Sequence, residues 1–205
     1  MADIALTESS EVTVADAAGT NKLLVNSNGS IDVSVLNTAS GYRLIIDPTG
    51  SIVQVPWEHY MTHQGMYFFF QDYATGIGNG STRDVLLITA NNGKGIHMKF
   101  GLATLGGSYA LYEAPTTTAN GGALTIVNKN RGSANTATLT AFSVPPVTGV
   151  GTLLVTILLG ASSKAASIDV LNPEIVLKPN TKYLVRFSSS AGSNISSCDG
   201  SFYEV

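Results

Sequence analysis

The stretch DVLLITANNGKGIHMKFGLAT, residues 84–104, indicates the fold class by itself. Two runs rich in Val, Ile and Leu, residues 84–90 and 96–104, flank the polar segment NNGKG. β-Branched, aliphatic and aromatic residues favour strands, and Asn-Gly tolerates the positive φ of a tight hairpin turn. We therefore expect two β-strands joined by a hairpin turn.

The same pattern continues on both sides of this stretch. Helix signals are nearly absent, because no window of a dozen residues sustains apolar positions at helical spacing. Further strand-sized segments, separated by Gly, Asn, Pro and Ser, lie at residues 65–73, 109–114, 123–130, 137–144, 152–160, 173–179, 182–190 and 194–205. This spacing is typical of a β-sandwich or a barrel. We predict an all-β fold: an antiparallel, jelly-roll-like β-sandwich over residues 57–205, preceded by a small N-terminal β-hairpin module.

Two further expectations concern local structure. The segment TLLVTILLG, residues 152–160, lacks alternation, so we expect a central strand that is buried on both faces. In KPNTKY, residues 178–183, Pro179 and Asn180 stand where a type I turn places them.

The N-terminal module carries a repeated phrase. LLVNSNGSIDVSV begins at Leu23 and LIIDPTGSIVQV at Leu44, and each reads as two short strands around turn residues. A two-stranded hairpin is only marginally stable in water, and two of them cannot enclose a proper core. Residues 1–56 must therefore rest on the sandwich, on symmetry mates or on a separate protein, and the sequence leaves these three alternatives open.

The composition excludes some classes of partner. Charged residues make up 12% of the chain, against roughly 25% in an ordinary soluble domain. A neutral surface suits contact with other copies or a partner, although a turn-rich β protein of ordinary function would look the same. The net charge of -3 and the scattered Lys and Arg residues argue against nucleic acid. The longest apolar run, residues 149–161, is shorter than the roughly 20 residues of a membrane helix, and no signal peptide is visible.

No catalytic constellation is visible in the sequence. Cys198 is the single cysteine, which excludes an internal disulfide and a zinc site built on cysteines. His59 and His63 follow Glu58 and do not form the metalloprotease pattern H-E-x-x-H, so we expect a loop or interface role. His97 is expected as a packed or half-exposed sheet residue. We predict no enzymatic activity, no metal and no cofactor.

The aromatic run YFFF, residues 67–70, has two interpretations. Alternate rings of a strand point to opposite faces, so core packing on one face and an interface on the other explain it most simply. A sugar-binding face is the alternative.

Four short motifs follow one another in the C-terminal part of the chain. They are Tyr-x-Leu-Tyr-Glu (Tyr109, Leu111, Tyr112, Glu113), Asn-x-Asn-Arg (Asn128, Asn130, Arg131), Leu-Lys-x-Asn-Thr-x-Tyr-Leu (Leu177, Lys178, Asn180, Thr181, Tyr183, Leu184) and an aromatic-Tyr-Glu close (Phe202, Tyr203, Glu204). Their order and spacing resemble a family of tailed-bacteriophage structural proteins, described as capsid decoration, cement or auxiliary head proteins. The family close is usually Trp-Tyr-Glu, and Phe202 stands here in place of the Trp.

The resemblance implies a structural virion protein that binds the outside of a bacteriophage capsid and stabilises the shell. Its partners would be the major capsid protein of the same phage and further copies of itself, as an expected homotrimer, with neither nucleic acid nor membrane. Residues 1–56 would serve as an arm for oligomerisation or capsid attachment. The protein would be made in the host bacterial cytoplasm and reside on the capsid surface.

The alternative is a head-fibre or tail-associated module that holds host glycans through loops such as 91–95 and 116–122. In either case the family resemblance marks a set of structural or interface residues: Tyr112, Glu113, Asn128, Asn130, Arg131, Asn180 and Tyr183. Arg131 either anchors its loop through bidentate hydrogen bonds or serves solubility, and the sequence does not choose between these roles.

Overall fold

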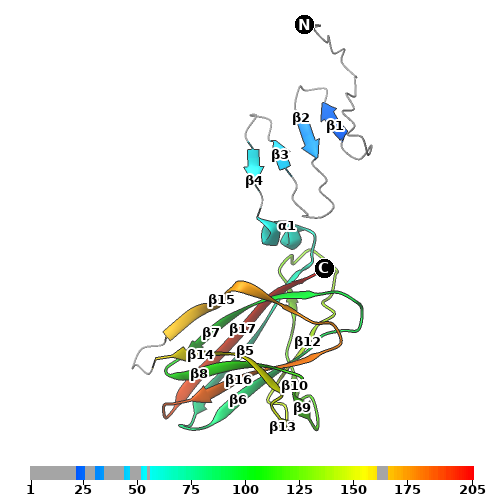
Figure 1. The fold of residues 1–205 in the computed structure, drawn as a ribbon. Coiled ribbons are helices and arrows are strands. Elements are labelled where there is room, and N and C mark those ends of the chain that lie inside the picture. Colours follow the sequence, from blue (N-terminus) through cyan, green and yellow to red (C-terminus); the bar gives the residue numbers. More distant parts are fainter. Residues whose placement is uncertain (1–21, 26–30, 35–43, 47–51, 55, 161–165) are drawn as a thin grey trace, which may run out of the picture. The chain divides into compact units, whose positions relative to one another are not determined.

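The computed structural model describes residues 22–25, 31–34, 44–46, 52–54, 56–160 and 166–205. The chain divides into two compact units, residues 1–60 and 61–205. The first unit holds two antiparallel hairpins, in which β1 (Lys22–Val25) pairs with β2 (Ile31–Ser34) and β3 (Leu44–Ile46) with β4 (Ile52–Gln54) (Figure 1). The predicted hairpins are thereby confirmed, while their turns at 26–30 and 47–51 lie outside the described residues.

A short helix, α1 (Trp57–His63), follows the hairpins. No helix was expected here. Of the two roles expected for His59 and His63, the loop was wrong, and the interface stays a prediction. The helix ends in a Schellman motif: the Met66 N–H donates to the Met61 carbonyl at 2.9 Å and the Gly65 N–H to the Thr62 carbonyl at 3.0 Å. Gly65 has φ +67°, which a glycine adopts without strain. Met61 is buried and packs the helix against the protein, and Gly65 ends it. Because α1 has only seven residues, no helical period could be seen in the sequence.

The second unit consists of two antiparallel sheets (Figure 1). The six-stranded sheet has the order β10-β12-β6-β16-β8-β14, with β10 (Gly122–Ala123), β12 (Thr140–Ser143), β6 (Thr82–Ile88), β16 (Lys182–Ser189), β8 (Gly107–Glu113) and β14 (Thr152–Leu159). The five-stranded sheet has the order β11-β5-β17-β7-β15, with β11 (Val127–Asn128), β5 (Tyr67–Ile77), β17 (Asn194–Glu204), β7 (Ile96–Thr104) and β15 (Ala166–Leu177). A separate ribbon pairs β9 (Thr116–Thr117) with β13 (Val147–Gly149).

The strand order is that of a jelly roll. Eight strands form the two rows β5-β17-β7-β15 and β6-β16-β8-β14. In chain order they make four pairs, β5 with β6, β7 with β8, β14 with β15 and β16 with β17, and each pair has one strand in each sheet. This arrangement is produced by two Greek keys folded over each other. The segment that carries β9 to β13 is inserted between β8 and β14, and β10, β11 and β12 extend the two sheets beyond β6 and β5. The predicted antiparallel, jelly-roll-like sandwich is confirmed.

Alternation along the strands builds the core between the sheets. On β7, Ile96, Met98, Phe100 and Leu102 are buried while the residues between them are partly exposed. Aromatic rings from different strands meet in this core, with Tyr109 and Phe187 at 5.0 Å between centroids. Burying such side chains contributes about 1.5–3 kcal/mol each, which makes this core the main source of stability.

Three local expectations were wrong. The segment NNGKG joins β6 in one sheet to β7 in the other, so it is an arch between sheets and not a hairpin turn, although Gly93 does have φ +74°. Asn180 has φ +51°, which a type I turn does not allow and a type II turn requires. Residues 123–130 are not one strand, because the chain crosses there from β10 in one sheet to β11 in the other.

The expectation for residues 152–160 was also wrong. β14 forms an edge of its sheet and is not buried on both faces. The register shifts between Leu153 and Val155, and this bulge hides the alternation in the sequence. Beyond the bulge, Val155 and Ile157 pack against the core, whereas Leu158 is 80% exposed.

Candidate interaction site

The structure brings two of the four sequence motifs together at one end of the six-stranded sheet. Glu113, at the end of β8, accepts a hydrogen bond from Lys178 Nζ at 2.8 Å and another from the Tyr183 hydroxyl at 3.1 Å. The same hydroxyl accepts the backbone N–H of Lys178 at 2.9 Å. A tyrosine that bonds the backbone a few residues upstream is the device that locks corners of immunoglobulin-like sandwiches. Glu113 and Tyr183 therefore fasten a corner of the sandwich.

The turn between Lys178 and Tyr183 is also held by the residues that follow β6. Thr89 Oγ1 donates to the Lys178 carbonyl at 2.7 Å and accepts the Thr181 N–H at 2.9 Å. The Asn180 N–H donates to the Ala90 carbonyl at 3.1 Å. Asn180 thus supplies the left-handed backbone that the turn needs, a position that asparagine tolerates better than most residues.

The hydrogen bonds at this corner shift the acidity of both side chains. The hydrogen bond from Lys178, followed by that from Tyr183, lowers the pKa of Glu113 below its ordinary value of 4.5. Burial, together with the neighbouring Glu113 carboxylate, raises the pKa of Tyr183. Glu113 is therefore held as a carboxylate acceptor and Tyr183 as a neutral donor, which suits a fixed corner.

The Asn-x-Asn-Arg motif organises a loop at the other edge of the sandwich. Asn128 Nδ2 donates to the carbonyls of Gly65 at 2.8 Å and Asn135 at 3.0 Å, and its Oδ1 accepts the N–H of Asn130. Asn130 Nδ2 in turn donates to the His63 carbonyl at 3.2 Å. These amides tie the loop after β11 to the end of α1.

The remaining motif residues differ in their surroundings. Glu204 is buried, and its carboxylate accepts the N–H groups of Thr138 at 2.7 Å and Leu139 at 3.1 Å. Tyr112 is partly exposed on the outer face of the six-stranded sheet, beside Leu153 in the register. Arg131 is exposed, and no hydrogen bond joins it to any residue that the structure describes. The loop is anchored instead by Asn128 and Asn130.

The C-terminal Tyr203 takes part in a small cluster on the outer face of the five-stranded sheet. Its ring stacks on His97 with centroids 4.6 Å apart, and both side chains contact the Glu174 carboxylate, at 2.9 Å and 2.8 Å. Burial alone would raise the pKa of Glu174, but the hydrogen bonds from His97 and Tyr203 outweigh it, so the pKa is lowered. The expectation of a packed or half-exposed His97 is confirmed.

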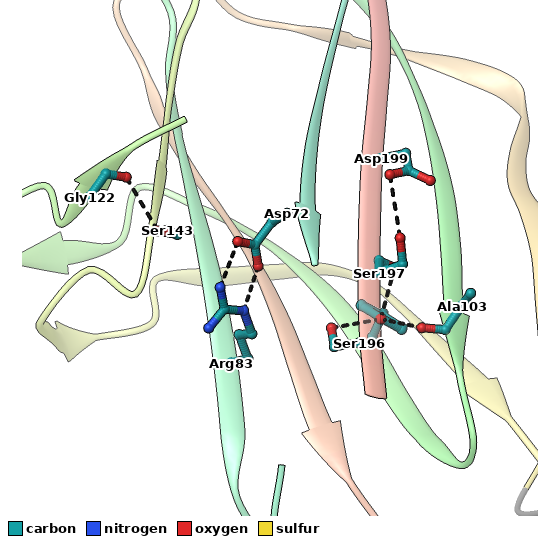
Figure 2. Close-up of polar contacts among 9 residues, drawn as sticks. Asp72, Arg83, Ala103, Gly122, Ser143, Ser196, Ser197 and Asp199 are labelled. Atoms are coloured by element: carbon teal, nitrogen blue, oxygen red, sulfur yellow. Dashed lines mark hydrogen bonds and ion pairs between the residues drawn. The ribbon is translucent and has the colours of Figure 1, made fainter. Parts of the chain in front are cut away.

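Polar groups inside the sandwich are paired structurally. Asp72 on β5 accepts two hydrogen bonds from Arg83 on β6, at 2.6 and 2.7 Å, and so joins the two sheets (Figure 2). The Tyr109 hydroxyl lies 2.9 Å from Ser196 Oγ and 3.0 Å from the Ala103 carbonyl. In the described part of the chain, no buried side-chain nitrogen or oxygen lacks a partner.

Possible groups for chemistry were sought among the residues that the structure describes. No three His, Cys, Asp or Glu side chains there are grouped so that they could hold a metal. Cys198 is buried and its pKa is raised by burial, which disfavours the reactive thiolate. Two open pockets of about 280 and 400 Å³ flank the loop after β11, and Glu204, the acid that lines the second, is already hydrogen-bonded. None of the helices within the described ranges has the length and apolar character to cross a membrane.

The surface features that sequence reasoning missed are exposed apolar side chains. Leu153, Leu154 and Leu158 are exposed along the β14 edge. On β5, Tyr73 is 58% exposed in the outer face of the five-stranded sheet, and Phe69 is exposed beside it. The alternation of the run 67–70 had already predicted an outward ring such as Phe69, so on this strand only Tyr73 was missed. One signal was available: residues 132–163 contain no charged side chain. No family model, curated protein or solved structure matches the chain.

Proposed function

We propose that the protein is a structural virion protein that binds the outside of a bacteriophage capsid and stabilises the shell. It acts as a homo-oligomer, with the major capsid protein of the same phage as its second partner, and it is not an enzyme. It is made in the bacterial cytoplasm and resides on the capsid surface. Residues 1–56 serve as the arm for oligomerisation or attachment.

One observation carries this proposal: the β14 edge exposes Leu153, Leu154 and Leu158 within a stretch of 32 residues, 132–163, that has no charge. Soluble proteins that work alone blunt their edge strands with charges, proline or β-bulges, and of these β14 has only the bulge at Leu154. An edge left neutral and apolar suits a protein whose surface is covered by other chains. The resemblance of the four motifs to phage decoration proteins is the reason for proposing a phage capsid as the assembly that this protein joins.

The motif residues fit a structural task. Glu113 and Tyr183 lock a corner, and Asn128 ties a loop to the end of α1. A protein that binds only the assembled shell stabilises it by RT ln(1 + [L]/Kd), about 2.7 kcal/mol per site at a hundredfold excess over Kd.

The test is to add the purified full chain to undecorated mature capsids. Saturable binding with a fixed number of copies per shell, together with a higher capsid melting temperature, is the expected result. A protein that stays in the supernatant at every concentration contradicts the proposal. Unassembled capsid protein serves as the control, because linkage requires weaker binding to the free subunit.

A second candidate is a host-recognition module that binds glycans. Tyr73, exposed on β5, lies two residues from Gln71, and Gln71 is paired in the register with Asp199 on β17. An exposed ring beside amide and carboxylate groups is a combination that sugars can use, through stacking and hydrogen bonds. A glycan array separates the two candidates, because the decoration function predicts no sugar specificity.

A further inference from the structure

Four Asn-Gly pairs occur in the chain, beginning at Asn28, Asn79, Asn92 and Asn120. An asparagine before a glycine can react with its own main chain, because glycine has no side chain to keep the Asn Cγ carbon away from the next backbone nitrogen. Asn28 lies outside the described residues. The other three pairs are all exposed, so hydrogen bonding distinguishes them.

The reaction consumes one water molecule and releases one ammonia, and nothing is oxidised or reduced. The glycine nitrogen gives up its proton to the solvent and attacks Cγ of the preceding Asn, and Nδ2 leaves as ammonia, which closes a cyclic succinimide. Water then adds to one of the two imide carbonyls. Opening of the bond to Cγ gives aspartate, and opening of the bond to the backbone carbon gives isoaspartate. The glycine N–H must therefore be free, and the Asn side chain must be able to turn onto it.

At Asn79 the attacking nitrogen is blocked. The Gly80 N–H donates to the Ser189 carbonyl at 2.9 Å, and the Ser189 N–H donates to the Ser81 carbonyl at 2.9 Å. These two bonds join the turn after β5 to the end of β16. Attack by the Gly80 nitrogen has to begin by breaking a backbone hydrogen bond, although the pair itself is exposed.

At Asn92 the side chain is held at both of its polar atoms. Its Nδ2 donates to Thr138 Oγ1 at 3.1 Å, and its Oδ1 accepts the N–H of Lys94 at 3.0 Å. Thr138 is itself fixed, because its hydroxyl donates to Glu204 at 2.8 Å. The bond to Thr138 has to break in every case, since Nδ2 is the group that leaves.

Asn120 has neither restraint. The loop is fixed just before it, where the Thr118 N–H donates to the Pro146 carbonyl at 3.1 Å, and just after it, where β10 begins. Between these points, no hydrogen bond joins the Asn120 side chain or the Gly121 N–H to any residue that the structure describes. Both residues are exposed, so water reaches the site.

We propose that Asn120 is a site of spontaneous deamidation, converted through a succinimide on the Gly121 nitrogen into aspartate and isoaspartate, while the fold protects Asn79 and Asn92. Each hydrogen bond that has to break first should slow the conversion about fivefold. This modification does not depend on the proposed capsid function.

The product places a charge where the chain has none. Residues 114–128 contain no Asp, Glu, Lys, Arg or His, and each conversion makes the net charge of -3 more negative by one. Isoaspartate also lengthens the main chain by one carbon just before β10. Modified copies are therefore separable by charge, and a partner of this neutral loop would meet a carboxylate.

The test is to store the folded full chain at neutral and at mildly alkaline pH, digest samples at acidic pH and follow each Asn-Gly peptide by mass spectrometry. Asn120 should convert at least about fivefold faster than Asn79 and Asn92. Its rate should rise with pH, because the Gly121 nitrogen must lose a proton. Asn120→Gln is the matched control: it keeps the amide but moves its carbonyl one carbon farther away, so the first acidic species on ion exchange should disappear.

Storage in urea shows whether the fold causes the difference. The three described pairs should then react at similar rates, because the hydrogen bonds that distinguish them are lost. The same ranking in urea would assign the difference to the flanking sequence and overturn the inference. Two results in the folded protein also overturn it: conversion of Asn79 or Asn92 as fast as Asn120, and an Asn120 that stays intact while it converts in urea.

Discussion

At the scale of single residues, the charges that matter most are those the sandwich buries. Asp72 is 3% exposed and pairs with Arg83 across the two sheets, and Glu204 holds the N–H groups of Thr138 and Leu139. The sequence singled out Glu204 through its family motif but gave no signal for Asp72, because pairing partners on different sheets cannot be read from spacing. Arg131, by contrast, was singled out and lies exposed.

The Asp72–Arg83 pair gives a first prediction. Asp72→Ala leaves the Arg83 guanidinium without its carboxylate in a partly buried place, so the free energy of unfolding should fall by about 3 kcal/mol. Lys178→Ala is the matched control, because Lys178 is 68% exposed in its ion pair with Glu113 and should cost less than about 1 kcal/mol. Urea denaturation measures both. Equal effects would mean that the inter-sheet pair contributes no more than a surface pair.

Gly200 gives a second prediction. It lies opposite Phe70 in the register of β17 and β5, and a Cβ at this position would overlap the Phe70 ring. Gly200→Ala should therefore destabilise the protein by about 1–3 kcal/mol, as overpacking does. In thermal melts, Gly192→Ala should be nearly neutral, because a Cβ there meets nothing within 4 Å. Adding Phe70→Leu to Gly200→Ala should recover part of the loss, and no recovery would argue against a steric cause.

At the scale of elements, alternation and turn residues predicted most strands but not their neighbours. The runs at 96–104, 182–190 and 194–205 became β7, β16 and β17 because clear alternation or strand-forming side chains marked them. The apolar run at 152–160 was placed at the centre when it forms an edge, because a bulge at Leu154 disguised its alternation. Helix α1 was missed because seven residues are too few to show a period.

The corner formed by Glu113, Lys178 and Tyr183 predicts a dependence of stability on pH. Because the folded state lowers the pKa of Glu113, its stabilisation is present above the ordinary value of 4.5 and is lost as the pH falls through the lowered value. Wild type should therefore melt above Glu113→Gln at neutral pH. Melting temperatures recorded from about pH 7 to about pH 3 should show the two curves converging at the acid end. A constant difference would show that the charge of Glu113 is not the cause.

At the scale of the whole molecule, the chain combines a well-packed jelly-roll core with surfaces that expose apolar side chains. The sandwich pairs its buried polar groups within the described residues, while the β14 edge and the β5 face expose apolar side chains. The N-terminal unit holds two short hairpins, and hairpins of this size are marginally stable without a partner. The fold class could be predicted from the sequence. The exposed apolar side chains of β14 could not, because their exposure depends on which strand lies at the edge of a sheet.

The most direct measurement is the mass of the full chain in solution, by light scattering over a range of concentrations. If the protein forms the expected stable homotrimer, its mass should be three times 21.3 kDa and should not depend on concentration. A mass of 21.3 kDa at every concentration would contradict the account, because the neutral edge and the aromatic face would then remain exposed in the working protein.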